Sequence, residues 1–159
     1  MIKIRSNPVA DSRTCDVTKV DLQTLMEASL QHIGDVCQGM AFFVQYLMLA
    51  AQQHDYDKLT QINWFYDNFR TKFEKQDWWT NHRRIHRHHL NYPDGVPDDV
   101  NLLDVLEHIA DCVMAGRARS GEIYPVLLSD ELLQRALQNT VLLLNRHVIV
   151  SNDSDRPSV

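Results

Sequence analysis

The sequence contains little that would cross-link the chain or anchor it in a membrane. Its three cysteines, Cys15, Cys37 and Cys112, are irregularly spaced, and no Cys-x-x-Cys pair occurs. This argues against a disulfide framework or a thiolate zinc site, and free thiols are typical of the reducing cytosol. The first eight residues lack the apolar core of a signal peptide, and the most apolar stretch, residues 40–51, is too short to span a bilayer. We therefore expect a cytoplasmic protein that does not bind membranes.

An excess of positive charge is also missing. The chain has 16 lysines and arginines against 21 acidic residues, which gives a formal net charge of −5. Binding to extended nucleic acid requires a basic surface that displaces counterions, so we do not expect it here. A small anionic ligand is compatible with this composition, because a local group of Lys and Arg can outweigh a mildly acidic whole.

Alternating patterns typical of strands are scarce, with short candidates only at residues 2–5 and 148–150. Apolar residues at helical spacing predict helices instead, over residues 19–53 with a bend near Gly34 or Gly39, from Thr60 onward, and over 75–89, 101–116 and 129–147. The 159 residues are enough to form one hydrophobic core. We expect an all-α, single-domain helical bundle of about five to seven helices over residues 17–150. A lead-in would precede it over residues 1–16, and a disordered tail would follow over residues 151–159.

Histidine, by contrast, is plentiful, and the pair His54-Asp55 is its most informative occurrence. An adjacent imidazole and carboxylate can bind one divalent cation, or the carboxylate can bridge two. Neighbouring residues inside a helix point about 100° apart, so both can reach one ion only where the helix unwinds. The pair is expected at such a helix end.

Further candidate ligands precede and follow this pair. The block from His82 to His89 is dense in histidine, and as a helix it would place His82, His86 and His89 on one stripe. A carboxylate within a helical bundle, such as Asp111, needs a cation or hydrogen bonds to compensate its charge. We predict one or two divalent ions (Mn, Fe, Co, Ni, Zn or Mg) bound by His32, His54, Asp55, His82, His88, His89 and Asp111. The alternatives are that His32 is an ordinary polar residue and that the histidine block is a solvated helix face.

Basic residues lie beside these candidate ligands. Lys58 follows Asp55 by three positions, and Arg83, Arg84 and Arg87 alternate with the histidines. All four could contact phosphoryl oxygens, the arginines through bidentate bonds. The alternative for the arginines is simple ion pairing with acidic residues at the surface.

At these residues the chain resembles the HD-domain superfamily of metal-dependent phosphohydrolases, over about residues 31–116. His32 is similar to the first motif histidine, His54-Asp55 to the defining pair and Asp111 to the closing aspartate. The segment from His54 to Lys58 is similar to the His-Asp-x-x-Lys form of the HD-GYP branch, although Leu90 stands where that branch has a glutamate. The overall pattern is most similar to small HD-like proteins of bacteria and bacteriophages.

The resemblance implies hydrolysis of a phosphate ester, such as a nucleotide or a related small molecule, through a metal-activated water. Asp55, Lys58 and Glu107 would be the catalytic residues, and Lys58, Arg83, Arg84 and Arg87 would bind the substrate. A dinuclear iron oxygenase on the same scaffold is the first alternative. A non-catalytic protein that metal merely stabilises is the second. Nothing in the sequence decides between a monomer and a homodimer.

Overall fold

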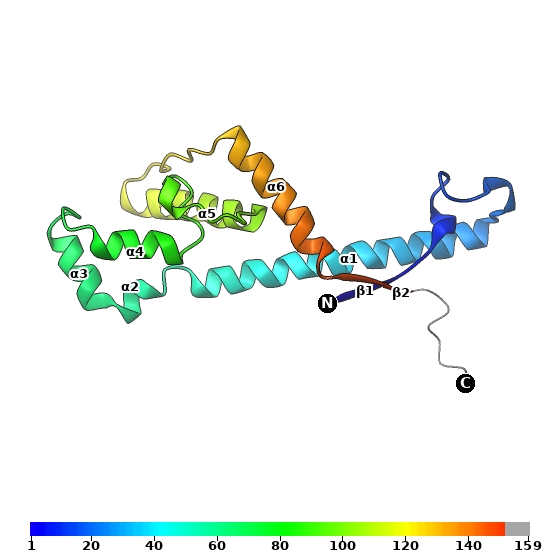
Figure 1. Ribbon diagram of the computed structural model, residues 1–159, viewed down its shortest axis with the longest axis horizontal. Coiled ribbons are helices and arrows are strands. Elements are labelled where there is room, and N and C mark those ends of the chain that lie inside the picture. Colours follow the sequence, from blue (N-terminus) through cyan, green and yellow to red (C-terminus); the bar gives the residue numbers. More distant parts are fainter. Residues whose placement is uncertain (152–159) are drawn as a thin grey trace. The chain divides into compact units, whose positions relative to one another are not determined.

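The structure is a computed structural model that describes residues 1–151, and most of these residues are helical (Figure 1). The helices are α1 (Leu22–Gln53), α2 (Asp57–Thr60), α3 (Ile62–Arg70), α4 (Asp77–Ile85), α5 (Leu102–Arg119) and α6 (Asp130–Asn145), and the strands are β1 (Ile2–Arg5) and β2 (Val148–Ser151). The all-α prediction is confirmed. The tail predicted over residues 151–159 lies outside the described residues except for Ser151, which ends β2.

The chain divides into two compact units. One contains residues 1–45 together with 143 onward, and the other contains residues 46–142. The prediction of one helical domain over residues 17–150 stays a prediction. Helix α1 belongs to both units, because the division falls between Gln45 and Tyr46.

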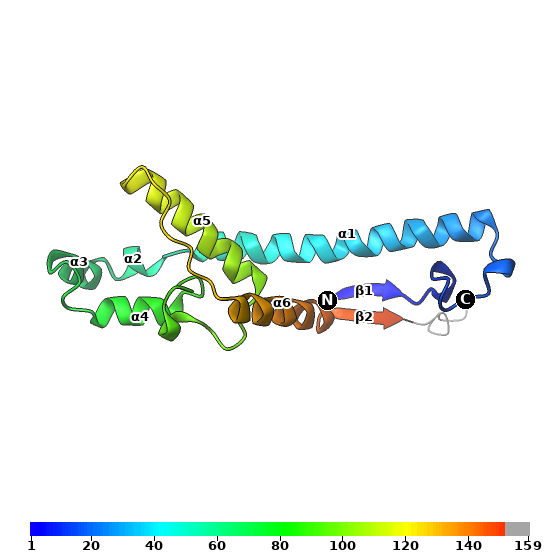
Figure 2. The same cartoon turned by 90° about the horizontal axis from the view of Figure 1, so that it is seen from above.

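The first unit contains the two strands, which pair in parallel with Ile2 opposite Val148 and Arg5 opposite Ser151 (Figure 2). Both candidate strand segments of the sequence are thus confirmed. The predicted bend in α1 is wrong, because the helix continues without a break past Gly34 and Gly39 to Gln53.

One described segment, Leu22–Thr60, is long and apolar enough to cross a membrane by length and composition alone. Its most apolar window has a mean hydropathy of 1.3, and 6% of that window is buried. Core helices of soluble proteins have the same length and composition. The expected cytoplasmic location and the absence of membrane binding therefore stay predictions.

In the second unit, a buried asparagine connects α3 to the start of α4. The side chain of Asn68, which is fully buried, accepts a hydrogen bond from the backbone N–H of Trp78 (3.2 Å) and donates one to Asp77 (2.8 Å). Trp78 is fully buried and packs on Phe65 with ring centroids 4.4 Å apart. These contacts fix α4, which carries the first histidine of the dense block.

Helix α5 begins at a capping box. Asn101 accepts a hydrogen bond from the N–H of Leu103 (2.9 Å), and Asp104 accepts one from the N–H of Asn101 (2.8 Å). Arg87 donates two further bonds to Asp104, of 2.7 and 2.8 Å. A helix start satisfied in this way is worth about 1 kcal/mol, and here it also connects α5 to the loop that follows α4. The hydrophobic core of this unit lies beside it and includes Leu90, Val100, Val105 and Ala136.

Candidate metal centre

The end of α1 places His54 and Asp55 in the second unit. The helix ends at Gln53, and Asp55 has a φ of 53°, in the left-handed region that aspartate tolerates better than most residues. The predicted unwinding at this pair is confirmed. It turns the Asp55 carboxylate back toward the His54 ring, so that Oδ2 lies 3.5 Å from Nε2 of His54. Lys58 forms an ion pair with the same carboxylate.

Helix α4 contributes His82, and the loop after it contributes His88. Both side chains are fully buried. The ring of His82 is oriented by Asp57, a fully buried carboxylate that accepts a hydrogen bond from His82 Nδ1 (2.9 Å) and another from His86 Nε2 (2.8 Å). With its Nδ1 occupied, His82 presents Nε2 to the interior.

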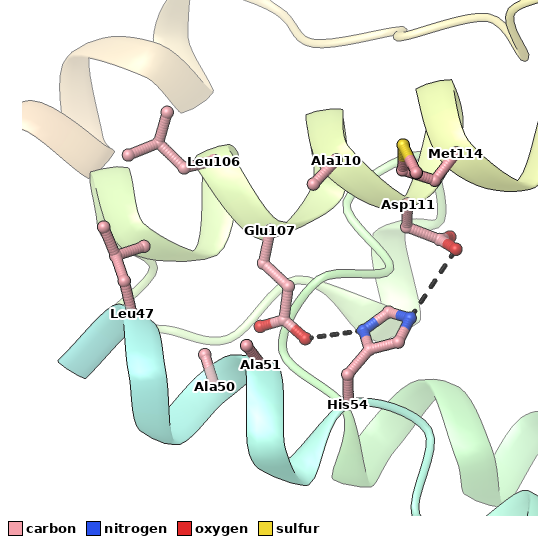
Figure 3. A pocket seen from close by; sticks show the side chains of 9 residues that line it. All are labelled: Leu47, Ala50, Ala51, His54, Leu106, Glu107, Ala110, Asp111 and Met114. Atoms are coloured by element: carbon pink, nitrogen blue, oxygen red, sulfur yellow. Dashed lines mark hydrogen bonds and ion pairs between the residues drawn. The ribbon is translucent and has the colours of Figure 1, made fainter. Parts of the chain in front are cut away.

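Glu107 on α5 orients the two other histidines. Its Oε1 accepts a hydrogen bond from Nδ1 of His54 (2.9 Å) and lies 3.0 Å from Nδ1 of His88. Figure 3 shows the His54 ring between Glu107 and Asp111, two residues one turn apart on α5. Asp111 Oδ1 lies 3.7 Å from the opposite nitrogen of that ring, Nε2. One glutamate thus makes a hydrogen bond with His54 and lies within ion-pair distance of His88.

Three buried atoms at the centre of this arrangement make no hydrogen bond within the described chain: Asp55 Oδ1, His82 Nε2 and His88 Nε2. Asp55 Oδ1 lies 3.3 Å from His82 Nε2 and 3.5 Å from His88 Nε2. A buried polar atom without a hydrogen-bond partner is costly, and three such atoms face one another here. Ligand atoms around one transition-metal ion are about 3.0–3.6 Å apart when its bonds are about 2.0–2.2 Å long. The donor set therefore fits a divalent cation.

Two groups of side chains have ligand atoms close enough to share an ion. One comprises His54, Asp55 and His88, and the other comprises Asp55, His82 and His86. Asp55 is common to both, as a bridging carboxylate would be. The Nε2 atom of His86 already donates to Asp57, so the second group depends chiefly on His82 and Asp55.

The electrostatics of the centre favour positive charge. The carboxylates of Asp111 and Glu107 raise the pKa of His54 to about 10. Burial opposes ionisation of Asp55, but the adjacent His82 and Lys58 side chains lower its pKa below the usual range. Asp57, Glu107 and Asp111 add three further carboxylates, against Lys58 as the nearby lysine. A bound cation would balance this excess, since unpaired buried charge is expensive.

Two of the predicted ligands lie elsewhere. His32 is exposed on α1 in the other unit, and about six turns of continuous helix precede His54, so the two cannot share an ion within one chain. His89 belongs to neither group, because α4 ends at Ile85 and the predicted stripe through His82, His86 and His89 does not form. The loop after α4 does bring His88, another of the predicted ligands, to the centre.

His89 instead faces a cavity of about 620 Å³ within the second unit. Lys58, Asp111 and Arg119 also line this cavity, and its remaining wall is largely aromatic, with Phe65, Phe69, Phe73, Trp79, Tyr92 and Tyr124. Burial lowers the pKa of His89 to about 2, so its ring is neutral, and its Nε2 makes no hydrogen bond within the described residues.

The three arginines do not line this cavity. Arg83 forms an ion pair with Asp94 (2.7 Å), and Arg87 pairs with Asp104 and Asp99 (2.7 and 2.9 Å). Arg84 is exposed. Ion pairing, the alternative role, therefore occurs at Arg83 and Arg87, and a contact of these arginines with substrate stays a prediction. Lys58 is the one predicted substrate contact that lies at the cavity.

Sequence reasoning missed Asp57. Its position between Asp55 and Lys58 in a polar segment is typical of an exposed residue, yet the short helix α2 buries it completely. A contact between residues 57 and 82 is a tertiary property, and the local sequence carries no periodic signal for it.

Comparison of the chain with protein-family models, with curated proteins and with solved structures found no match.

Proposed function

We propose that this protein is a metal-dependent phosphohydrolase that acts on a nucleotide or a related small phosphoester. The observation that carries the proposal is the convergence of His82 Nε2 and His88 Nε2 on Asp55 Oδ1. All three atoms are buried, and none makes a hydrogen bond within residues 1–151. The resemblance of the sequence to HD-domain phosphohydrolases agrees with this assignment.

The proposed ligands are His54, Asp55, His82 and His88, with Asp111 at the edge of the site. A divalent ion, when bound, lowers the pKa of a coordinated water and neutralises phosphoryl oxygens. Glu107 and Asp57 act as positioning residues, because each fixes the outer nitrogen of a ligand histidine. Such partners set the orientation of the ring and raise its basicity.

Lys58 and the aromatic cavity support the substrate assignment. Lys58 lines the cavity and also pairs with Asp55, so its ammonium can contact a phosphoryl oxygen close to the proposed ions. A positive group at this position stabilises charge that develops on the phosphate. The aromatic wall offers stacking surfaces for a planar base, and the neutral His89 offers a hydrogen-bonding group beside them.

Hydrolysis of 4-nitrophenyl phosphate and of nucleoside monophosphates with added Mn²⁺ tests the proposal. We expect wild-type turnover that chelation abolishes, and a loss of at least 100-fold in Asp55→Ala and His88→Ala. His32→Ala serves as the matched control and should keep its activity. Oxygen-dependent turnover with bound iron and no phosphatase activity would replace this proposal with the oxygenase alternative. Activity that persists in both Asp55→Ala and His88→Ala would contradict it outright.

A further inference from the structure

A second cavity beside the candidate metal centre has an aliphatic lining. It measures about 410 Å³ and lies within the second unit, between the last turns of α1 and the middle of α5 (Figure 3). Its walls are Leu47, Ala50 and Ala51 from α1 and Leu106, Ala110 and Met114 from α5. Its lining contains no phenylalanine, tyrosine, tryptophan, lysine or arginine, in contrast to that of the larger cavity.

The polar end of this aliphatic cavity consists of groups from the candidate metal centre. His54, Glu107 and Asp111 complete its lining, and Asp111 lines the aromatic cavity as well. The two cavities therefore diverge from one polar region, one with an aliphatic wall and one with an aromatic wall. A polar group at one end of a ligand in the aliphatic cavity would therefore lie next to the candidate metal centre.

The aliphatic side chains of this cavity are also poorly covered. Leu106 is 50% exposed and Met114 is 70% exposed, and the three alanines leave the space between the helices open. Apolar area that a ligand removes from water contributes favourably to binding. Ligand sites in proteins have volumes of about 300–1,000 Å³, a range that includes this cavity.

We propose that this cavity binds the unbranched aliphatic chain of an amphiphilic phosphoester, whose anionic head lies at the candidate metal centre. The inference rests on the proposed function for the position of the head group. An apolar helix face of a second copy is the competing occupant. It fits less well, because it would bury His54, Glu107 and Asp111 under apolar side chains and leave their charges without solvent or counterion.

The test is a binding series with ethyl, butyl, hexyl and octyl phosphate, measured by calorimetry on the full-length chain with Mn²⁺ and again after chelation. We expect the affinity to rise about two- to fourfold per methylene until the cavity is filled. Ala110→Phe and Ala51→Phe fill the cavity from its two walls, and each should abolish the dependence on chain length. Both alanines are exposed, so the larger side chains are compatible with folding.

Ala115→Phe is the matched control, because Ala115 lies on the same helix but lines the aromatic cavity. It should preserve the dependence on chain length and instead weaken binding of phenyl phosphate. A flat series in wild type, or a series that Ala110→Phe and Ala51→Phe leave unchanged, would overturn the inference. So would a dimer that dissociates in Ala110→Phe, since a second copy would then be the occupant. If the affinity rises with chain length but does not depend on Mn²⁺, and no phosphoester is hydrolysed, the aliphatic site stands and the proposed function fails.

Discussion

Replacing Glu107 with glutamine distinguishes two ways in which this carboxylate can affect metal affinity. It can orient the ligand histidines, or it can change their protonation. Glu107 Oε1 contacts Nδ1 of both His54 and His88, and these two contacts lower the pKa of Glu107 to about 2 although its burial acts in the opposite direction. Loss of one such partner of a metal ligand typically costs about 10- to 100-fold in metal affinity. Because one carboxylate serves two ligands here, we expect Glu107→Gln to bind Mn²⁺ about 100-fold more weakly.

The sign of this effect is informative, because the opposite mechanism predicts the opposite result. Glu107 also raises the pKa of His54, and a proton on that imidazole competes with a metal ion. If Glu107 acted only through this proton, its removal would strengthen Mn²⁺ binding. Titration calorimetry of wild type and Glu107→Gln at pH 8 distinguishes the two, with the exposed Glu122→Gln as control. Unchanged or tighter binding in Glu107→Gln would refute the orienting role.

Two predictions concern stability. A hydrogen bond from Asn68, aided by one from Trp64, lowers the pKa of Asp77 from 3.8 to about 2 despite opposing desolvation, so Asp77 stabilises the fold above about pH 4 and loses this contribution as the pH falls through 2. The difference in urea midpoint between wild type and Asp77→Asn should therefore shrink steadily from pH 5 to pH 2, and a constant difference would contradict this origin. A Cβ at Gly95 would lie 2.6 Å from the carbonyl oxygen of His89, so Gly95→Ala should cost about 1–3 kcal/mol in urea denaturation and also weaken Mn²⁺ binding through His88. Full stability in Gly95→Ala would show that this loop can move away freely.

The sequence was sufficient for the helical class and for the local geometry of one pair. Apolar spacing identified the helical segments, and the two short strands coincide with the candidate segments at residues 2–5 and 148–150. The unwinding at His54-Asp55 could be predicted because two adjacent ligands cannot converge inside a regular helix. It is realised by the positive φ of Asp55.

The histidine block was harder, because its pattern is compatible with a longer helix than the one that forms. Helix α4 ends at Ile85, and His86 is already extended, with φ −103° and ψ 120°. The following loop is fixed by contacts distant in sequence, among them the ion pairs from Arg87 to Asp104 and Asp99. No local signal distinguishes His88 from His89, so the choice between them required the tertiary structure.

Helix α1 shows a different limit. Gly34 and Gly39 each cost about 1 kcal/mol in a helix interior, which favoured a bend near one of them. The helix continues through both, because the apolar residues on either side keep its periodicity. Asp57 was missed for the opposite reason, since a polar segment gave no indication that one of its carboxylates is fully buried.

Metal analysis of the purified full-length chain tests the central claim most directly. Elemental analysis and Mn²⁺ titration should give at least one tightly bound divalent ion per chain in wild type and in His32→Ala. The paired variant Asp55→Ala/His88→Ala should bind none, while keeping the far-ultraviolet circular dichroism of a helical protein. An unchanged metal content in the paired variant, or a wild-type chain that binds no divalent cation at millimolar concentration, would contradict the account.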